Sequence, residues 1–310
     1  MTDRKQSLEG FTNPTATPAS PDQAHVWQAA NRAWWESHPM RYDWKEAVKA
    51  EEFSREFYEE IDERFFSKAK EFMPWRKIPF DTLIDFESLA DKDVLEIGVG
   101  NGSHALLLAQ HARAFTGIDL TDYAVKSTSE RLRLSGIRAQ VVQMDAERLS
   151  LPDNSFDFVW SWGVIHHSAN PQDIIKAMGR VLRPGGRAIT MVYYRSWWSY
   201  YGTGALVGLR TGMMLKTRSL HASVQQRTDG ALARFYSIGE WKRLVSHSFR
   251  VERIGVYGPK SDIVPLPAGR LKGATIRLFP DELGQFLTNR LRMGSLLVSV
   301  LAKTSDTEPV

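Results

Sequence analysis

The stretch Val94-Leu-Glu-Ile-Gly-Val-Gly-Asn-Gly102 contains the features that decide the fold. Its apolar run predicts a buried strand over 94–97, and glycines at every second position from Gly98 predict a tight turn into a helix that begins near Ser103. The spacing differs from the G-x-G-x-x-G dinucleotide fingerprint, and no Lys-Ser/Thr pair follows, which excludes a P-loop. Taken alone, the turn is compatible with any α/β protein.

Downstream of this turn, apolar runs alternate with helical patterns. Helices are predicted near 121–135, 173–182 and 238–246. The further strands are predicted at 114–118, 140–143, 156–160, 187–192, 249–256 and 295–302. This order predicts an α/β fold built on a doubly wound, mostly parallel, seven-stranded Rossmann-like sheet.

The remaining segments are expected to surround that sheet. Residues 1–22 are rich in Pro, Thr and Ser and are expected to form a disordered leader. Residues 23–90 are predicted to form an N-terminal helical cap, broken near His38-Pro39. The α/β domain then spans 91–310, with insertions at 193–235 after the fifth strand and at 258–292 after the sixth.

The composition of the 310 residues excludes several classes of chemistry. The chain has no cysteine, so it has no disulfide framework, no thiolate nucleophile and no Cys-based zinc or iron–sulfur site. No signal peptide or membrane span is predicted, no metal site is expected, and a cytoplasmic location fits best. Charge is uneven: residues 183–310 carry 19 Lys+Arg against 8 Asp+Glu, or +11. This excess indicates either a solvated basic face or contact with an anionic substrate, carrier or membrane.

Acidic residues follow two neighbouring strands of the predicted sheet. Asp119 ends the second strand, and Asp145 follows the third. The carboxyl ends of parallel strands form the edge where open α/β sheets bind ligands, and a carboxylate there can accept hydrogen bonds from ribose hydroxyls. The sequence therefore predicts that an adenosine-containing ligand binds at this edge.

Four ordered motifs carry a family resemblance. They are EIGVGNG (96–102), GIDL (117–120), MDAERLSLPDNSFDFVWSWGVIHH (144–167) and RVLRPGG (180–186). Over about residues 90–195 the chain resembles the class I S-adenosylmethionine-dependent methyltransferases, in particular the methyltransferase type 11 group with the UbiE-like quinone C-methyltransferases. The resemblance implies S-adenosyl-L-methionine as the cofactor and S-adenosyl-L-homocysteine as its product.

The resemblance also implies the residues that bind this cofactor. Backbone at the glycines would approach its methionine part, beside a glutamate that orders the turn, and side chains after the second, third and fourth strands would hold the ribose, the adenine and the carboxypropyl arm. In chain order these residues are Glu96, Gly98, Gly100, Gly102, Asp119, Leu120, Asp145, Ala146, Trp162 and Gly163.

Candidates for the acceptor side follow the fourth and fifth strands. His166 and His167 are candidate general bases, although one or both could instead pack beside the cofactor or cap the next helix. Substrate contacts are predicted at Tyr193, Tyr194, Arg195 and Tyr236, with a hydrophobic plug or a solvated surface as the alternative. Arg227 and Arg234 are further candidates for binding an anionic group.

The predicted function is methyl transfer to an oxygen or carbon of a small molecule, either anionic or aromatic. Ser161-Trp162-Gly163-Val164 stands where many amine-methylating enzymes have [N/D]-P-P-[Y/F], which argues against exocyclic amines of bases and glutamine side chains as acceptors. Two alternatives stay open: a nucleic-acid-modifying methyltransferase, and a non-catalytic cofactor-binding partner protein. The segment 205–215 is expected either to form a lid or to contact a membrane peripherally. The sequence does not predict the oligomeric state.

Overall fold

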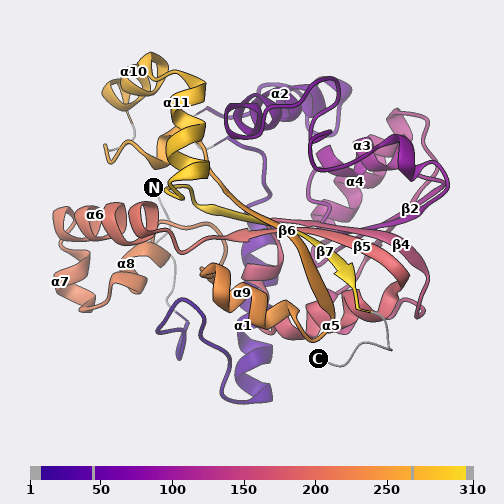
Figure 1. Ribbon diagram of the computed structural model, residues 1–310, viewed down its shortest axis with the longest axis horizontal. Coiled ribbons are helices and arrows are strands. Elements are labelled where there is room, and N and C mark those ends of the chain that lie inside the picture. Colours follow the sequence, from indigo (N-terminus) through magenta and orange to yellow (C-terminus); the bar gives the residue numbers. More distant parts are fainter. Residues whose placement is uncertain (1–7, 44–45, 267–268, 305–310) are drawn as a thin grey trace.

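Seven strands form one mixed sheet in the computed structural model, which describes residues 8–43, 46–266 and 269–304. Their order across the sheet is β3-β2-β1-β4-β5-β7-β6 (Figure 1). In chain order the strands are β1 (Asp93–Ile97), β2 (Ala114–Asp119), β3 (Gln140–Gln143), β4 (Phe156–Trp162), β5 (Leu182–Tyr193), β6 (Phe249–Tyr257) and β7 (Leu296–Lys303).

The strand directions confirm the predicted fold class. Strands β1 to β5 pair in parallel, with Leu95 opposite Thr116 on β2 and Val159 on β4. Strand β7 is antiparallel to both of its neighbours, β5 and β6. Strand β5 begins earlier than the predicted residue 187 because Leu182 pairs with Phe156, and a register shift then separates this pair from that of Arg187 with Phe158.

Helices cover both faces of the sheet (Figure 1). On one face, α5 (Pro171–Val181) and α9 (Ile238–Val245) bury their apolar sides against Leu95 and Ile97. On the other, α2 (Arg55–Phe72), α3 (Ser103–Ala109) and α4 (Asp122–Leu134) pack over Val94 and Trp160. Successive strand residues thus point to opposite faces, as a sheet covered on both sides requires.

The N-terminal segment differs from the expected disordered leader. Residues 8–20 pack on α1 (Pro21–Ser37), and the ring centroid of Phe11 lies 5.4 Å from that of Trp27. The Pro14 carbonyl accepts a hydrogen bond from the Phe235 amide at 2.9 Å. The few apolar side chains of this Pro- and Thr-rich segment bury themselves against Trp27, and this contact gives the segment a fixed path. Residues 1–7 of the expected leader lie outside the described residues.

Both insertions are helical and lie at the same end of the molecule (Figure 1). The first contains a π-helical turn, η4 (Trp197–Thr203), and α6 (Gly204–Arg210), α7 (Met213–Thr217) and α8 (Leu220–Gln225). The second contains η5 (Lys260–Asp262), α10 (Arg270–Leu278), α11 (Asp281–Gln285) and η6 (Phe286–Arg290). Short 3-10 turns are η1 (Glu87–Leu89), η2 (Ala146–Arg148) and η3 (Ile165–His167). Among the described residues, no helix combines the length and the hydropathy that crossing a bilayer requires.

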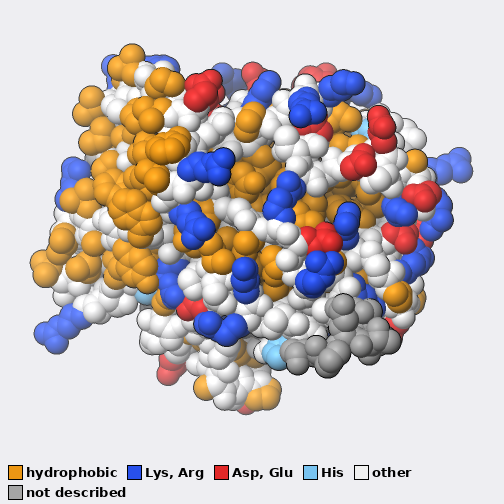
Figure 2. Space-filling model, in the orientation of Figure 1, with side chains coloured by type: hydrophobic (Ala, Val, Ile, Leu, Met, Phe, Trp, Pro, Cys, Tyr) orange, Lys and Arg blue, Asp and Glu red, His pale blue; other side chains and the backbone are white. Residues whose placement is uncertain are grey.

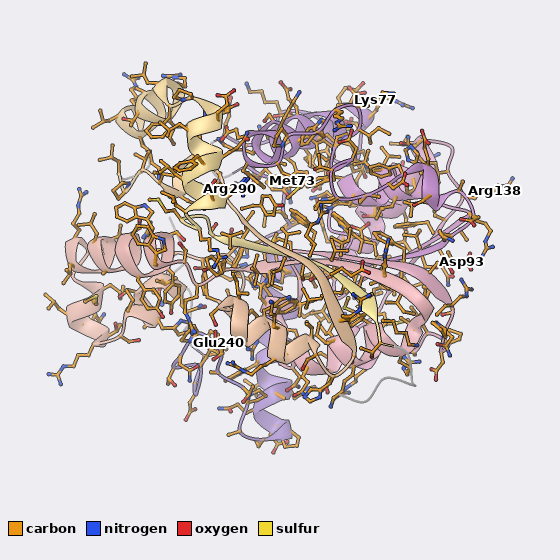
Figure 3. The ribbon with its side chains drawn as sticks, viewed as in Figure 1. Met73, Lys77, Asp93, Arg138, Glu240 and Arg290 are labelled. Atoms are coloured by element: carbon orange, nitrogen blue, oxygen red, sulfur yellow. The ribbon has the colours of Figure 1, made fainter. Side chains whose placement is uncertain are left out.

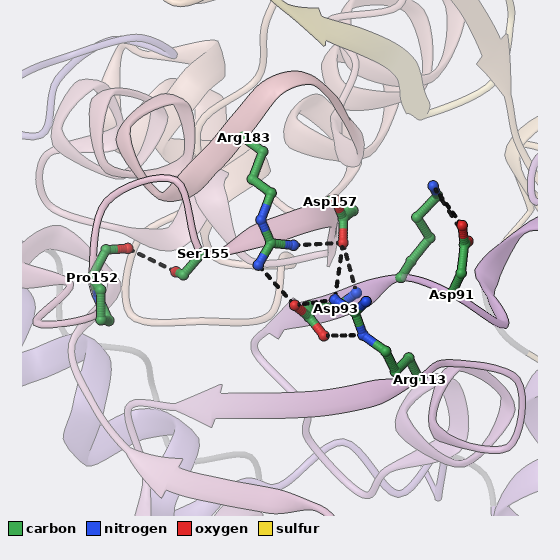
Figure 4. Close-up of polar contacts among 8 residues, drawn as sticks. Asp91, Asp93, Arg113, Pro152, Ser155, Asp157 and Arg183 are labelled. Atoms are coloured by element: carbon green, nitrogen blue, oxygen red, sulfur yellow. Dashed lines mark hydrogen bonds and ion pairs between the residues drawn. The ribbon is translucent and has the colours of Figure 1, made fainter.

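Ion pairs connect the amino ends of neighbouring strands of the sheet (Figure 4). Arg183 donates to Asp157 at 2.6 Å and to Asp93 at 2.8 Å, while Arg113 donates to Asp93 at 2.6 Å. Asp157 also accepts the Asp93 amide at 2.9 Å. Figure 3 places Asp93 at the opposite side of the view from Arg290 of the second insertion. The carboxyl ends, which point toward the insertions, therefore lie away from this network.

Candidate active site

The turn after β1 has backbone that only glycine adopts readily. Gly98, Gly100 and Gly102 have φ angles of +82°, +55° and +79°. A Cβ on Gly98 would lie 2.1 Å from the Val164 side chain, whereas a Cβ on Gly100 would meet no heavy atom of the described residues within 4 Å. The outer glycines therefore allow close packing, and the middle one faces open space.

Glu96 is buried beneath this turn. Its side chain is 1% exposed, and Oε2 has no hydrogen-bond partner among the described residues. Oε1 lies 3.8 Å from Nδ1 of His104. Burial raises the pKa of Glu96 well above its usual value, with a further contribution from the charge of Asp119, and burial lowers the pKa of His104 to about 3. An unpartnered buried carboxyl oxygen is costly, and it is suited to receiving a cationic donor.

The two predicted carboxylates lie at the neighbouring strand ends. Asp119 accepts hydrogen bonds from the Thr121 hydroxyl at 2.8 Å and the Gly100 amide at 3.2 Å, so it ties β2 to the glycine turn. Asp145 accepts from the side chain of Gln28 at 2.9 Å. Burial raises the pKa of both carboxyls. Leu120 is half-buried and Ala146 is buried, each directly after one of these carboxylates.

The N-terminal helices hold this edge through contacts that sequence reasoning missed. Asn101 donates to the Met40 carbonyl at 2.7 Å, and Arg131 of α4 pairs with Asp62 of α2. Glu36, at the end of α1, accepts the Asp122 amide at 2.9 Å at the start of α4. Each contact joins residues more than 60 positions apart, so no local pattern signals it.

The residues predicted after β4 lie in aromatic surroundings. Trp162 stacks on Trp160 with ring centroids 5.2 Å apart and an interplanar angle of 3°. Gly163 follows with φ of +79°, and its amide donates to the Met191 carbonyl at 3.1 Å. The left-handed glycine turns the chain sharply from β4 into η3, which carries the two histidines.

Both histidines are buried, at 0% exposure for His166 and 3% for His167. The ring of His166 lies 3.9 Å from that of Tyr193, and neither of its nitrogens has a partner among the described residues. Burial lowers the pKa of His166 well below its usual value, which keeps the ring neutral. In His167, Nδ1 lies 2.7 Å from the Leu232 carbonyl. A carbonyl only accepts, so Nδ1 donates its proton to it.

The four predicted substrate residues separate into two groups. Tyr193 packs between His166 and Phe235, and burial raises the pKa of its hydroxyl. Tyr194 pairs instead with Tyr236 through a parallel backbone bridge. Tyr236 is 4% exposed and packs on Trp241 of α9, where burial raises its pKa to about 12. Only Tyr193 of these four thus contacts the histidines.

The structure gives two predicted anion-binding arginines a different role. Arg195 forms an ion pair of 2.5 Å with Glu240, which caps the start of α9 (Figure 3). Arg234 is 1% exposed and donates to the carbonyls of Ala16, Ser168 and Ala169. Each arginine therefore joins distant segments of the chain. All three nitrogens of the Arg234 guanidinium donate to carbonyls, so this buried side chain has little left to offer an anion, whereas Arg195 donates to Glu240 through one nitrogen.

Comparison with known proteins gives one family match. Residues 95–190 match the family model described as a methyltransferase domain. The chain is 29% identical over 174 residues to a tRNA U34 carboxymethyltransferase of Pseudoalteromonas atlantica, a match covering 50% of this chain and 53% of that protein. It is 28% identical over 169 residues to a ubiquinone biosynthesis O-methyltransferase of Pseudomonas fluorescens, covering 53% of this chain and 72% of that protein.

A solved structure extends the likeness beyond the matched region. A chain from the complex between the Haloferax volcanii Trm112 methyltransferase activator and a methyltransferase superposes with a TM-score of 0.52 at 14% identity, covering 80% of this chain and 95% of that one. At that identity the likeness concerns the fold alone. The chain spans about half the length of the first relative, 53%, so the comparisons bear on the domain and not on a whole protein's substrate.

Proposed function

We propose that this chain, which carries a class I S-adenosylmethionine-dependent methyltransferase domain at residues 95–190, methylates an oxygen or carbon of a small molecule. One observation carries the proposal. The carboxyl ends of the adjacent strands β1, β2 and β3 carry three groups: the open Gly100 turn, Asp119 and Asp145. Together these groups suit one extended cationic nucleoside.

The residues at this edge of the sheet fit S-adenosyl-L-methionine. The unpartnered Oε2 of buried Glu96 suits a cationic group at the methionine end, and the turn at Gly100 leaves space for close backbone approach. Asp119 would accept from the ribose hydroxyls and Asp145 from the adenine amino group. These two carboxyls already hold the amides of Gly100 and Glu147, which fixes their orientation before anything binds.

The chain's own contribution to the reaction is placement and proton removal. When bound, the cofactor supplies an electrophilic sulfonium methyl group, so aligning the acceptor atom provides much of the rate. With its ring neutral and Nδ1 donating to Leu232, His167 would take at Nε2 the proton that an acceptor hydroxyl or carbon acid releases. Neutral His166 and the Tyr193 ring would form an apolar wall beside it.

Coverage of the acceptor side favours a small molecule. The ring of Trp35 on α1 lies 5.0 Å from that of His167, and Phe235 of the first insertion stacks on Tyr193 at 5.3 Å. Elements of this chain therefore enclose the histidines from two directions. A base within a folded nucleic acid would require α1 or the insertion to move.

The first experiment measures S-adenosyl-L-homocysteine binding by calorimetry on the wild type and on Asp119→Ala. We expect binding by the wild type, a loss of at least tenfold in Asp119→Ala, and no change in Asp91→Ala, whose carboxylate lies at the amino edge. If the wild type does not bind, or if Asp119→Ala binds equally well, the cofactor assignment is wrong.

A second experiment tests the acceptor chemistry with phenols, quinones and carboxylates. His167→Asn retains a donor near the Leu232 carbonyl and removes the ring nitrogen Nε2. We expect it to lower kcat by about 10²–10⁴-fold with unchanged cofactor affinity. Wild-type turnover in His167→Asn would refute its role as a base.

Nucleic acid is the second candidate acceptor. The excess of +11 over residues 183–310 and the tRNA-acting name of the first relative favour it. Filter binding with mixed RNA at rising salt distinguishes the two candidates. Phosphate contacts would give a steep loss of affinity with salt, whereas a small-molecule enzyme would show no appreciable RNA binding at physiological salt.

A further inference from the structure

The two insertions form one continuous unit. The indole of Trp197 donates to the Leu291 carbonyl at 3.0 Å, and the indole of Trp198 donates to the Ile263 carbonyl at 3.1 Å. Ser196 also donates to the Met293 carbonyl at 3.0 Å. Residues 65 to 97 positions apart in sequence are thereby joined, which holds the two insertions together at one end of the molecule (Figure 1).

This unit leaves large apolar side chains in solvent. Figure 2 shows orange side chains gathered over α6, α10 and α11. Six residues define what we call the insertion face, with exposures from 43% to 84%: Trp197, Leu206, Leu209, Leu271, Leu278 and Leu291. An apolar surface of this kind on a folded chain marks an interaction site.

Helix α10 has the pattern of a helix lying in an interface. None of its residues is buried in this chain. Leu271 and Leu278, 71% and 84% exposed, are seven positions apart and share a face, and Arg270 and Arg277 repeat at the same spacing beside them. A leucine row bordered by an arginine row is typical of helices that lie in the headgroup region of a bilayer.

The charge around the insertion face indicates which occupant it fits. Residues 193–228 contain five Lys or Arg and no Asp or Glu, and residues 258–292 contain six against three. Two of these cations are paired, Arg195 with Glu240 and Lys260 with Asp281. Within the described part of the chain, no ion pair involves Arg210 or Arg218 at the ends of α6 and α7. Unpaired cations beside exposed leucines match an anionic lipid surface.

We propose that the insertion face docks on the surface of anionic membranes, with the exposed leucines and Trp197 in the headgroup region and the surrounding cations on lipid phosphates. Two contributions to membrane affinity, apolar burial and electrostatic attraction, differ in origin. Apolar burial acts on any bilayer, whereas the electrostatic attraction requires anionic lipid and is screened by salt. Docking is separate from the proposed methyl transfer, and neither requires the other.

Vesicle co-sedimentation of the full chain tests this proposal, with phosphatidylcholine vesicles compared with vesicles that also contain phosphatidylglycerol. We expect binding to the anionic vesicles, weakened by salt, and little binding to the neutral ones. The double variant Leu271→Glu/Leu278→Glu should lose at least tenfold in partitioning, because both charges would enter the headgroup region. Arg210→Gln/Arg218→Gln should lose binding mainly at low salt.

Val26→Glu is the matched control, since this α1 residue is 58% exposed and lies outside both insertions. It should bind vesicles like the wild type. Because no residue of α10 is buried, the double Glu variant should keep the wild-type melting temperature. Absence of wild-type binding, or equal binding by the double Glu variant, would overturn the proposal.

Sedimentation velocity without lipid gives the remaining outcome. We expect the wild type and the double Glu variant to have the same oligomeric state. If the wild type self-associates, the variant is monomeric and neither binds vesicles, then the insertion face is an interface between copies of this chain and the membrane proposal is wrong.

Discussion

Replacing Gly100 by alanine separates the cofactor role of the glycine turn from its structural role. This residue has φ of +55°, and an added Cβ would meet no heavy atom within 4 Å. A methyl group there costs only the strain of the left-handed conformation, about 1–2 kcal/mol. Gly136, after α4, is a matched control with φ of +70° and equally open surroundings.

The two variants should therefore behave alike in stability and differ in binding. Both should lose about 1–2 kcal/mol of unfolding free energy. In Gly100→Ala alone, the methyl would occupy the space through which the cofactor approaches the backbone, and overpacking of this kind costs about 1–3 kcal/mol. Since 1.4 kcal/mol corresponds to a factor of ten, we expect about a tenfold or greater loss of affinity for S-adenosyl-L-homocysteine.

Calorimetry gives the affinities, and thermal unfolding followed by circular dichroism gives the stabilities. Wild-type affinity in Gly100→Ala would refute the inference that the cofactor approaches this turn. An equal loss of affinity in Gly136→Ala would show that the effect comes from general destabilisation and not from the site.

Three further outcomes follow from particular contacts. Gly98→Ala should destabilise the fold by about 2–5 kcal/mol, from strain plus the clash at 2.1 Å, and Val164→Ala should partly restore the melting temperature. Burial raises the pKa of Asp262 to about 6, above its value in the unfolded chain, so the fold is more stable at low pH, where this carboxyl is protonated, and loses that stability as the pH rises through 6. Asparagine cannot ionise, so Asp262→Asn should be more stable than the wild type by up to about 3 kcal/mol at pH 8 and equally stable at pH 3.5, as measured by urea unfolding. The ion pairs with Arg113 and Arg183 lower the pKa of Asp93, so the stability that they give is present above its unfolded pKa of about 3.9 and is lost as the pH falls through the lowered value. Arg183→Met should therefore make acid unfolding below about pH 4 less steep, and an unchanged profile would contradict this.

Local sequence signals predicted most of the domain correctly. The end of β2 and the start of α4 are an example: a helix is predicted near 121–135, and α4 begins there, with the Thr121 hydroxyl accepting the Ala124 amide at 3.3 Å. Capping, period-two alternation and glycine turns act over a few residues, so one sequence contains enough information to locate them.

Contacts between distant segments were beyond such signals. Gln28 reaches Asp145 across 117 positions, and Arg195 reaches Glu240 across 45. An arginine after a strand has the same appearance in sequence whether it binds a substrate anion or a neighbouring carboxylate. The composition of residues 8–20 indicated disorder because the segment itself has few apolar residues. It packs instead on Trp27, which lies outside the segment and therefore does not count in its composition.

The two edges of the sheet differ in how completely their polar groups are satisfied. At the amino edge, Asp93 is held by two arginines. At the carboxyl edge, buried polar atoms of Glu96 and His166 have no hydrogen-bond partner in the part of the chain that the structure describes, against the usual rule that such atoms are paired. Buried polar atoms without partners lower the stability of a fold, and they are commonly retained where they serve ligand binding. The contrast thus favours, on energetic grounds alone, the same edge for the ligand that the glycine turn indicates on steric grounds.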